Sequence, residues 1–80
     1  MMTNKEYTYQ ELLLKIGLKV SYYRKLNGIS QEELAERIGK SVGFIGMIEA
    51  PGVSKGVSIK TLFDISNVLN VPIRKFFEEF

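Results

Sequence analysis

Few side chains in this sequence could carry out chemistry. The chain has no Cys and no His, so it lacks thiolates and the commonest general base and metal ligand. Glu32, Glu33 and Glu36 could form a metal or acid–base cluster, but a charged outer helix face explains them without any site. The run Gly39–Ser41 matches the end of a phosphate-binding loop, yet the earlier glycine that this loop requires falls on Leu34. We therefore expect no enzyme activity, no metal and no cofactor.

Length and composition indicate one small domain. With 80 residues the chain has room for a single modest core, so we treat 1–80 as one domain with a flexible segment at 1–8. Lys and Arg exceed Asp and Glu by 11 to 9, which permits nucleic-acid binding without requiring it. No stretch approaches the roughly 18 apolar residues of a membrane span, and the start of the chain is too polar for a signal peptide. The expected location is the cytoplasm, with no membrane partner.

Residues 30–50 have the pattern of two short amphipathic helices joined at a glycine. Ser30 and Glu33 form a capping box, so a helix begins directly after Ser30. That helix ends at Gly39, which adopts a positive φ easily, and Ser41 caps the next helix. The apolar inward residues are Leu34, Ala35 and Ile38 on the first helix and Ile45 and Ile48 on the second. This arrangement predicts a helix-turn-helix, whose second helix enters a DNA groove.

Three further segments also have helical patterns. We expect a helix over 9–26 that starts with a Thr8–Glu11 capping box, a helix from Ser58 to Asn70, and a short helix after Pro72. Their apolar residues are Leu13, Ile16, Val20 and Tyr23 in the first, Ile59, Leu62, Ile65, Ser66 and Leu69 in the next, and Phe76, Phe77 and Phe80 in the last. We expect Phe77 in the core, with one of the other two phenylalanines free for a dimer contact.

The main alternative to these helices is a pair of strands. Residues 42–48 and 53–59 have suitable compositions, but neither has a convincing partner strand, and 50–57 is rich in loop-forming residues. The predicted fold is therefore all-α, with five helices in a compact domain.

Three motifs resemble one known family. They are RKLNGISQEELAERIG at 24–39, the helix ending Ile45, Ile48 and Glu49, and the apolar run from Leu62 to Pro72. Through them residues 13–77 resemble the Cro/XRE-type, phage-repressor-like family of helix-turn-helix domains. The resemblance implies a five-helix, lambda-repressor-like DNA-binding domain. The loop after Glu49 departs from the family pattern, because it is longer and has Pro51 where a glycine is typical.

The resemblance also gives roles to single residues. Arg24 and Glu49 occupy the places of an ion pair that holds the recognition helix against the scaffold. Gln31 matches a glutamine that contacts the DNA backbone, and Phe44 matches a position that is often aromatic. Breaking such an ion pair from one side only would be costly.

The outward positions of the third helix are unusual for base recognition. They are Ser41, Val42, Gly43, Gly46 and Met47, a set with one hydroxyl and no amide or guanidinium. Val42 and Met47 can contact thymine methyl groups, and the two glycines allow the backbone to approach DNA closely. Each glycine costs the helix roughly 1 kcal/mol relative to alanine, so either bulk is excluded there or the helix is marginally stable.

Phosphate contacts are expected around this helix. The candidate side chains are Lys40, Lys55 and Lys60, although lysines on a small helical domain are often only solvated. The helix starts at Ser30 and Ser58 could present backbone N–H groups to phosphates, in addition to their simple capping role.

Two functions remain open at this stage. The first is a sequence-specific regulator, usually a repressor, that binds double-stranded DNA as a homodimer over a near-palindromic operator and takes no small-molecule ligand. The dimer would form through the fifth helix and its phenylalanines by analogy with the family. The second is an antitoxin-type or other protein-interaction module that uses the apolar outer face of the third helix, with DNA binding secondary. Val42, Phe44 and Met47 distinguish them, because a DNA-binding face is bare in the free protein.

Overall fold

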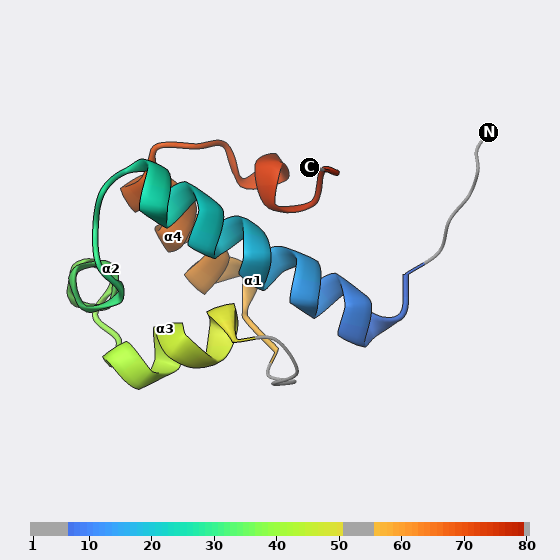
Figure 1. Cartoon of the computed structure of the whole chain (residues 1–80), viewed down its shortest axis with the longest axis horizontal. Helices are drawn as coiled ribbons and strands as arrows, with labels where there is room; N and C mark the ends of the chain where they lie inside the picture. The colour runs from blue at the N-terminus through green and yellow to red at the C-terminus, as the bar shows by residue number, and fades with distance from the viewer. Residues whose placement is uncertain (1–6, 51–55, 80) are drawn as a thin grey trace.

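The computed structural model describes residues 7–50 and 56–79. Its elements are α1 (Tyr9–Leu26), α2 (Gln31–Ile38), α3 (Val42–Glu49), α4 (Ile59–Leu69) and a 3-10 turn, η1 (Ile73–Phe76). Figure 1 shows α1 crossing the centre of the molecule, with α3 on one side and the C-terminal segment on the other. The same view shows α2 end-on while α3 runs across it, so these two helices cross steeply. The described residues contain no strand, which confirms the all-helical class.

The helix boundaries follow from capping hydroxyls, as predicted. Each α-helix begins directly after a side chain that accepts a backbone N–H from its first turn, and these caps are Thr8, Ser30, Ser41 and Ser58. The capping box at Thr8 is complete. At Ser30 the predicted box is only half formed, because the Glu33 carboxylate instead binds Arg37, 2.5 Å away. Gly39 and Asn70 have left-handed φ values of 71° and 59°, which end α2 and α4.

The core lies where α1, α2, α3, α4 and η1 meet. Its fully buried large side chains are Val20, Leu34, Ile45, Leu62, Ile65, Leu69 and Phe76. Ala35 is also buried, which lets α2 approach its neighbours closely. The predicted apolar faces of the first four helices therefore meet in one core, except that Leu13 and Ile59 are not among its residues.

Three predictions about the fourth and fifth elements need correction. Ile59 is 67% exposed, because it is the first residue of α4 and precedes the turn that reaches the core. The predicted fifth helix is a single 3-10 turn, and the chain leaves it at Phe77. Phe76 is therefore fully buried whereas Phe77 is 42% exposed, contrary to its predicted place in the core. Phe80 lies outside the described residues.

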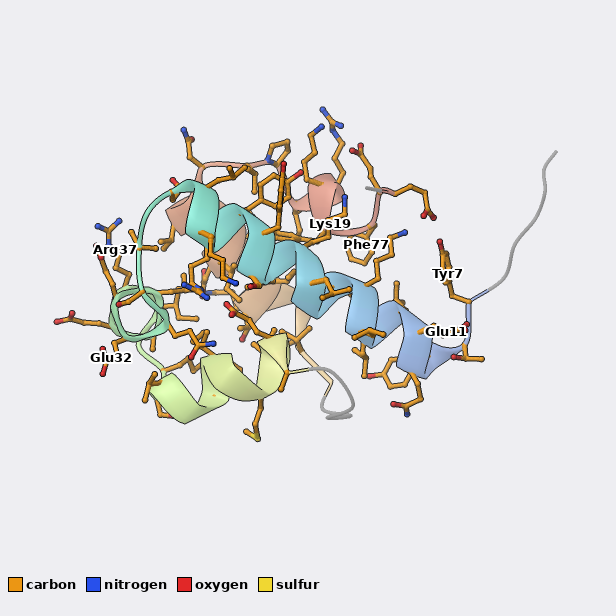
Figure 2. All side chains as sticks on the ribbon, viewed as in Figure 1. Tyr7, Glu11, Lys19, Glu32, Arg37 and Phe77 are labelled. Atoms are coloured by element: carbon orange, nitrogen blue, oxygen red, sulfur yellow. The ribbon has the colours of Figure 1, made fainter. Side chains whose placement is uncertain are left out.

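Two lysines of α1 hold the C-terminal segment. The Nζ atom of Lys15 donates to the carbonyl oxygen of Phe77 over 3.0 Å, and that of Lys19 donates to the carbonyl oxygen of Glu79 over 3.1 Å. Figure 2 labels Lys19 and Phe77 on the side of α1 where the C-terminal segment runs. The Tyr7 hydroxyl donates to the Glu79 carboxylate, and this hydrogen bond raises the pKa of Tyr7. Lys15 and Lys19 are thus structural side chains rather than solvated ones.

Candidate nucleic-acid interface

A buried ion pair fixes α3 to α1. The Arg24 guanidinium donates from Nε to Oε2 of Glu49 over 2.8 Å and from Nη2 to Oε1 over 3.0 Å. Its Nη1 donates to the carbonyl oxygen of Ile29 over 2.9 Å, which ties the pair to the chain before α2. Both side chains are at least nine-tenths buried, and the hydrogen bonds to Glu49 raise the pKa of Arg24. The ion pair expected from the family resemblance is therefore present.

Gln31 joins the same network. Its Nε2 donates to Oε1 of Glu49 over 3.0 Å, so the start of α2 is held at the end of α3. An amide side chain has two N–H donors and an acceptor oxygen, and this contact uses one donor. A phosphate contact by Gln31 remains a prediction.

A glycine in α1 sets how closely α3 approaches. Gly17 is buried, and a Cβ atom placed on it would lie 2.1 Å from the backbone oxygen of Ile48 near the end of α3. No real Cβ contact is that short, so a larger residue would force α3 away from α1. The sequence analysis missed this residue, although a lone glycine inside a helical pattern is a signal of close packing.

The outer face of α3 is exposed in the described part of the chain. Val42 and Met47 are 45% and 37% exposed, and Lys40, Ser41 and Gly43 are exposed as well. Gly46 is partly covered. In contrast Ile45, on the inner face, has no exposed surface. One face of α3 is therefore buried in the core, and the opposite face is accessible to a partner.

Phe44 does not lie bare on this face. It is partly buried and packs against the core, so only two of the three distinguishing apolar residues are exposed. The Nζ atom of Lys40 lies 5.3 Å from the centroid of the Phe44 ring, a cation–π contact. Phe44 is thus placed to orient Lys40 at the start of α3.

The two glycines of α3 have no packing role. The nearest atom to a Cβ on Gly43 would be Oγ of Ser41 at 3.9 Å, an ordinary contact. A Cβ on Gly46 would have no described atom within 4 Å. Among the described residues, packing therefore does not exclude a larger side chain at Gly43 or Gly46.

The helix N-termini differ as phosphate sites. The first turn of α2 contains Glu32 and Glu33, whose charges oppose an approaching phosphate, and Figure 2 shows Glu32 beside α2. The first turns of α3 and α4 contain no acidic residue. Of the two predicted phosphate sites, the N-terminus of α4 is therefore more suitable than that of α2. The N-terminus of α3, which is preceded by Lys40, is as suitable as that of α4.

Three further residues were predicted to contact DNA: Ser58, Lys60 and Lys55. Ser58 caps α4 and its hydroxyl also donates to Thr61. Lys60 forms an ion pair with Asp64 one turn later, so a phosphate would have to compete with that carboxylate. Lys55 lies outside the described residues.

No helix within 7–50 or 56–79 is long and apolar enough to cross a membrane. In the same ranges there is no group of three or more His, Cys, Asp or Glu side chains arranged to hold a metal ion.

Helices α2 and α3 cross steeply, and α3 has a buried inner face and an exposed outer face. This arrangement defines a helix-turn-helix protein. A helix-turn-helix family model matches residues 20–76, well over half of the chain. The chain belongs to this family, which is of the Cro/XRE type. Membership places it among DNA-binding transcription regulators.

Solved structures support the assignment. The chain is similar to the restriction-modification controller protein C.AhdI from Aeromonas hydrophila, with a TM-score of 0.79 and 27% identity over 89% of this chain and 100% of that one. It is also similar to SinR, a master regulator for biofilm formation in complex with DNA, with a TM-score of 0.72 and 33% identity over 79% of this chain and 98% of that one.

Two further comparisons add less. A hypothetical transcription factor from Neisseria, NHTF, has a TM-score of 0.77 over 98% of this chain and 87% of its own, but its 18% identity shows the fold alone. A search of curated proteins gave no match.

Proposed function

We propose that the chain is a sequence-specific transcription regulator that inserts α3 into the major groove of DNA. The contrast between the two faces of α3 carries this proposal. Its inner face is buried with Ile45 and the Glu49 ion pair, while Val42 and Met47 are exposed on the outside. An α-helix with its side chains is about 10–12 Å across, so α3 fits a major groove about 12 Å wide.

The base contacts would come mainly from apolar groups and from shape. The exposed side chains of Val42 and Met47 would contact thymine methyl groups, and the hydroxyl of Ser41 would donate to a base or a phosphate. Because the outer face has no guanidinium or amide, sequence-dependent DNA shape would supply much of the remaining specificity. The exposed ammonium of Lys40 and the N-termini of α3 and α4 would bind phosphates.

The regulator would act as a homodimer and as a repressor. Two copies would place their recognition helices about 34 Å apart, one turn of DNA, over a near-palindromic operator. Binding near a promoter would exclude polymerase. The similarity to SinR, whose structure contains DNA, supports the mode of binding rather than the direction of regulation.

A second function uses the same face. The outer face of α3 has two exposed apolar side chains, Val42 and Met47, and no guanidinium or amide for base reading, which favours a protein partner. In that case the chain would be an antitoxin-type interaction module with secondary DNA binding. Measuring the affinity for DNA separates the two functions.

The glycines of α3 provide a test of the proposed function. Replacing Gly46 or Gly43 by Ala should raise the free energy of unfolding by about 0.5–1 kcal/mol each, because alanine favours a helix and the space is open. The same changes should weaken binding to mixed-sequence duplex DNA, since the added methyl group separates the backbone of α3 from the groove. Urea unfolding and fluorescence anisotropy measure the two effects.

Asn67→Ala is the matched control for these variants. Asn67 is exposed on α4, so this change raises helix propensity away from α3 and should leave DNA affinity unchanged. If the α3 alanine variants gain stability and bind DNA as tightly as the parent, the close approach of α3 to DNA is refuted.

A further inference from the structure

An unexplained row of apolar side chains runs along the outside of α1. Leu14, Leu18 and Tyr22 are 41%, 43% and 48% exposed and lie at i, i+4 and i+8, so they form one ridge. The buried residues of α1, among them Ile16 and Val20, lie on the opposite side. Single exposed leucines are common on small proteins, but a continuous ridge marks an interaction surface.

This ridge is distinct from the surfaces already described. The side of α1 that carries Gly17 and Arg24 packs against α3. The side that carries Lys15 and Lys19 holds the C-terminal segment. The ridge lies between these two flanks and away from the core, so the proposed DNA contacts of α3 do not use it.

The ridge is complementary to itself when two copies of α1 run antiparallel. In such a pair with Leu18 at the two-fold axis, residues equally far from Leu18 on either side face each other. Leu14 then meets Tyr22 of the second copy, because each lies four residues from Leu18. Glu11 meets Lys25 of the second copy, because each lies seven residues away. At a shallow crossing of about 20° these long charged side chains are within reach of each other.

The charges at the ends of the ridge are available for this pairing. Glu11 and Lys25 are both exposed, and Figure 2 shows Glu11 at the N-terminal end of α1 near Tyr7. Oε1 of Glu11 accepts from the backbone of Thr8, and its second oxygen can accept from a lysine. Two symmetric ion pairs would then flank an apolar centre and fix the antiparallel register.

A hollow beside the ridge fits the same arrangement. It has a volume of about 250 Å³ and is lined by Tyr7, Glu11, Leu14, Lys15, Leu18 and Glu79. In the antiparallel pair, Tyr22 of the second copy reaches this hollow through its contact with Leu14. An aromatic ring with a polar tip suits a site that is lined by both leucines and charged side chains.

We propose that the outer face of α1 (Glu11, Leu14, Leu18, Tyr22 and Lys25) is a homodimer interface in which two copies of α1 pack antiparallel. The partner is a second copy of this chain. This interface would replace the one expected through the fifth helix. Of the two described phenylalanines at the end of that segment, Phe77 is exposed and Phe76 is buried. The inference rests on the proposed function in one respect, which is that a dimeric regulator would bind DNA through this dimer. Self-association can be measured without DNA, so its failure is distinct from a failure to bind DNA.

Sedimentation equilibrium of the full chain tests the proposal. The parent should dimerise with a micromolar dissociation constant, as expected for one helix face with few anchors. Leu18→Glu should weaken the dimer at least about thirtyfold, because it places two carboxylates at the apolar centre. Phe77→Glu should leave the dimer unchanged, and circular dichroism checks that both variants are folded.

Charge reversal tests the register itself. Glu11→Lys alone and Lys25→Glu alone each create two like-charge contacts in their own homodimers, which should weaken dimerisation roughly tenfold. An equimolar mixture of these two variants should form a heterodimer, because both of its end pairs then have opposite charges. Native mass spectrometry distinguishes the heterodimer from either homodimer.

Three outcomes would overturn the proposal. One is a parent chain that stays monomeric up to high protein concentration. A second is a dimer that Phe77→Glu disrupts and Leu18→Glu does not, which would place the interface at η1. The third is a dimer that appears only after removal of residues 1–6, which would mean that this segment covers the ridge in the complete chain.

Discussion

Replacing Glu49 by Leu is expected to lower the free energy of unfolding by about 3–5 kcal/mol, the cost of breaking a buried ion pair from one side. Among the described residues, the substitution leaves the buried Arg24 guanidinium with the Ile29 carbonyl as its remaining hydrogen-bond acceptor. It also removes the acceptor of the Gln31 amide. Because a domain of this size has only about 5–15 kcal/mol of stability, urea unfolding should show a large shift in the midpoint.

Two controls show that the loss comes from an unpaired buried charge. Adding Arg24→Met to Glu49→Leu should restore most of the stability, because apolar side chains can replace a buried pair with little cost. Glu33→Gln removes one partner of the exposed pair with Arg37 and should change the stability by less than about 1 kcal/mol. A Glu49→Leu variant as stable as the parent would contradict the anchoring role given to this ion pair.

Replacing Gly17 by Ala is expected to lower the free energy of unfolding by about 3 kcal/mol, at the upper end of the usual cost of overpacking. The new Cβ would lie 2.1 Å from the Ile48 backbone oxygen, and a backbone atom cannot move aside as a flexible side chain does. The α3 helix would have to shift away from α1. Thermal or urea unfolding measures the stability, and anisotropy measures the accompanying loss of DNA affinity.

Gly46→Ala is the matched control for Gly17→Ala. Both changes add one methyl group inside a helix, but the space at Gly46 is open among the described atoms. The two substitutions should therefore have opposite signs, destabilising at Gly17 and stabilising at Gly46. If Gly17→Ala is also stabilising, α3 does not pack against α1 as closely as the structure indicates.

Local chemistry explains which parts of the fold could be predicted from the sequence. A hydroxyl cap acts within one turn of its own helix, so Thr8, Ser30, Ser41 and Ser58 set the helix starts without knowledge of the rest of the chain. The left-handed exit at Gly39 is equally local. The Arg24–Glu49 pair joins distant parts of the chain, and its prediction came from the family resemblance rather than from any spacing.

The missed features depend on contacts between elements. Gly17 lies inside a regular helical pattern, and its role appears only once the path of α3 past α1 is known. Phe76 and Phe77 are neighbours of the same residue type, and only the place where η1 ends decides which of them is buried. Lys19 is buried because the C-terminal segment returns across α1, which no local pattern could predict.

In the candidate site, too, local features could be predicted from the sequence and contacts between elements could not. The order of residues on α3 was enough to predict that Val42 and Met47 are exposed. It was not enough to predict that Phe44 packs inward beneath Lys40, because that depends on the shape of the neighbouring core. Lys60 and Asp64 have the i, i+4 spacing of a helical ion pair. The sequence therefore already indicated that Lys60 has a carboxylate partner that competes with a phosphate.

The most direct test of DNA binding by α3 is fluorescence anisotropy of the purified full chain with mixed-sequence duplex DNA at two salt concentrations. Phosphate contacts release condensed counterions, so the affinity should fall by more than tenfold between about 50 and 200 mM salt. Gly17→Ala should weaken binding at low salt, because it forces α3 away from its packed position against α1. Absence of binding by the parent chain at about 50 mM salt, or an affinity independent of salt, would contradict the DNA-binding function and favour a protein partner for the outer face of α3.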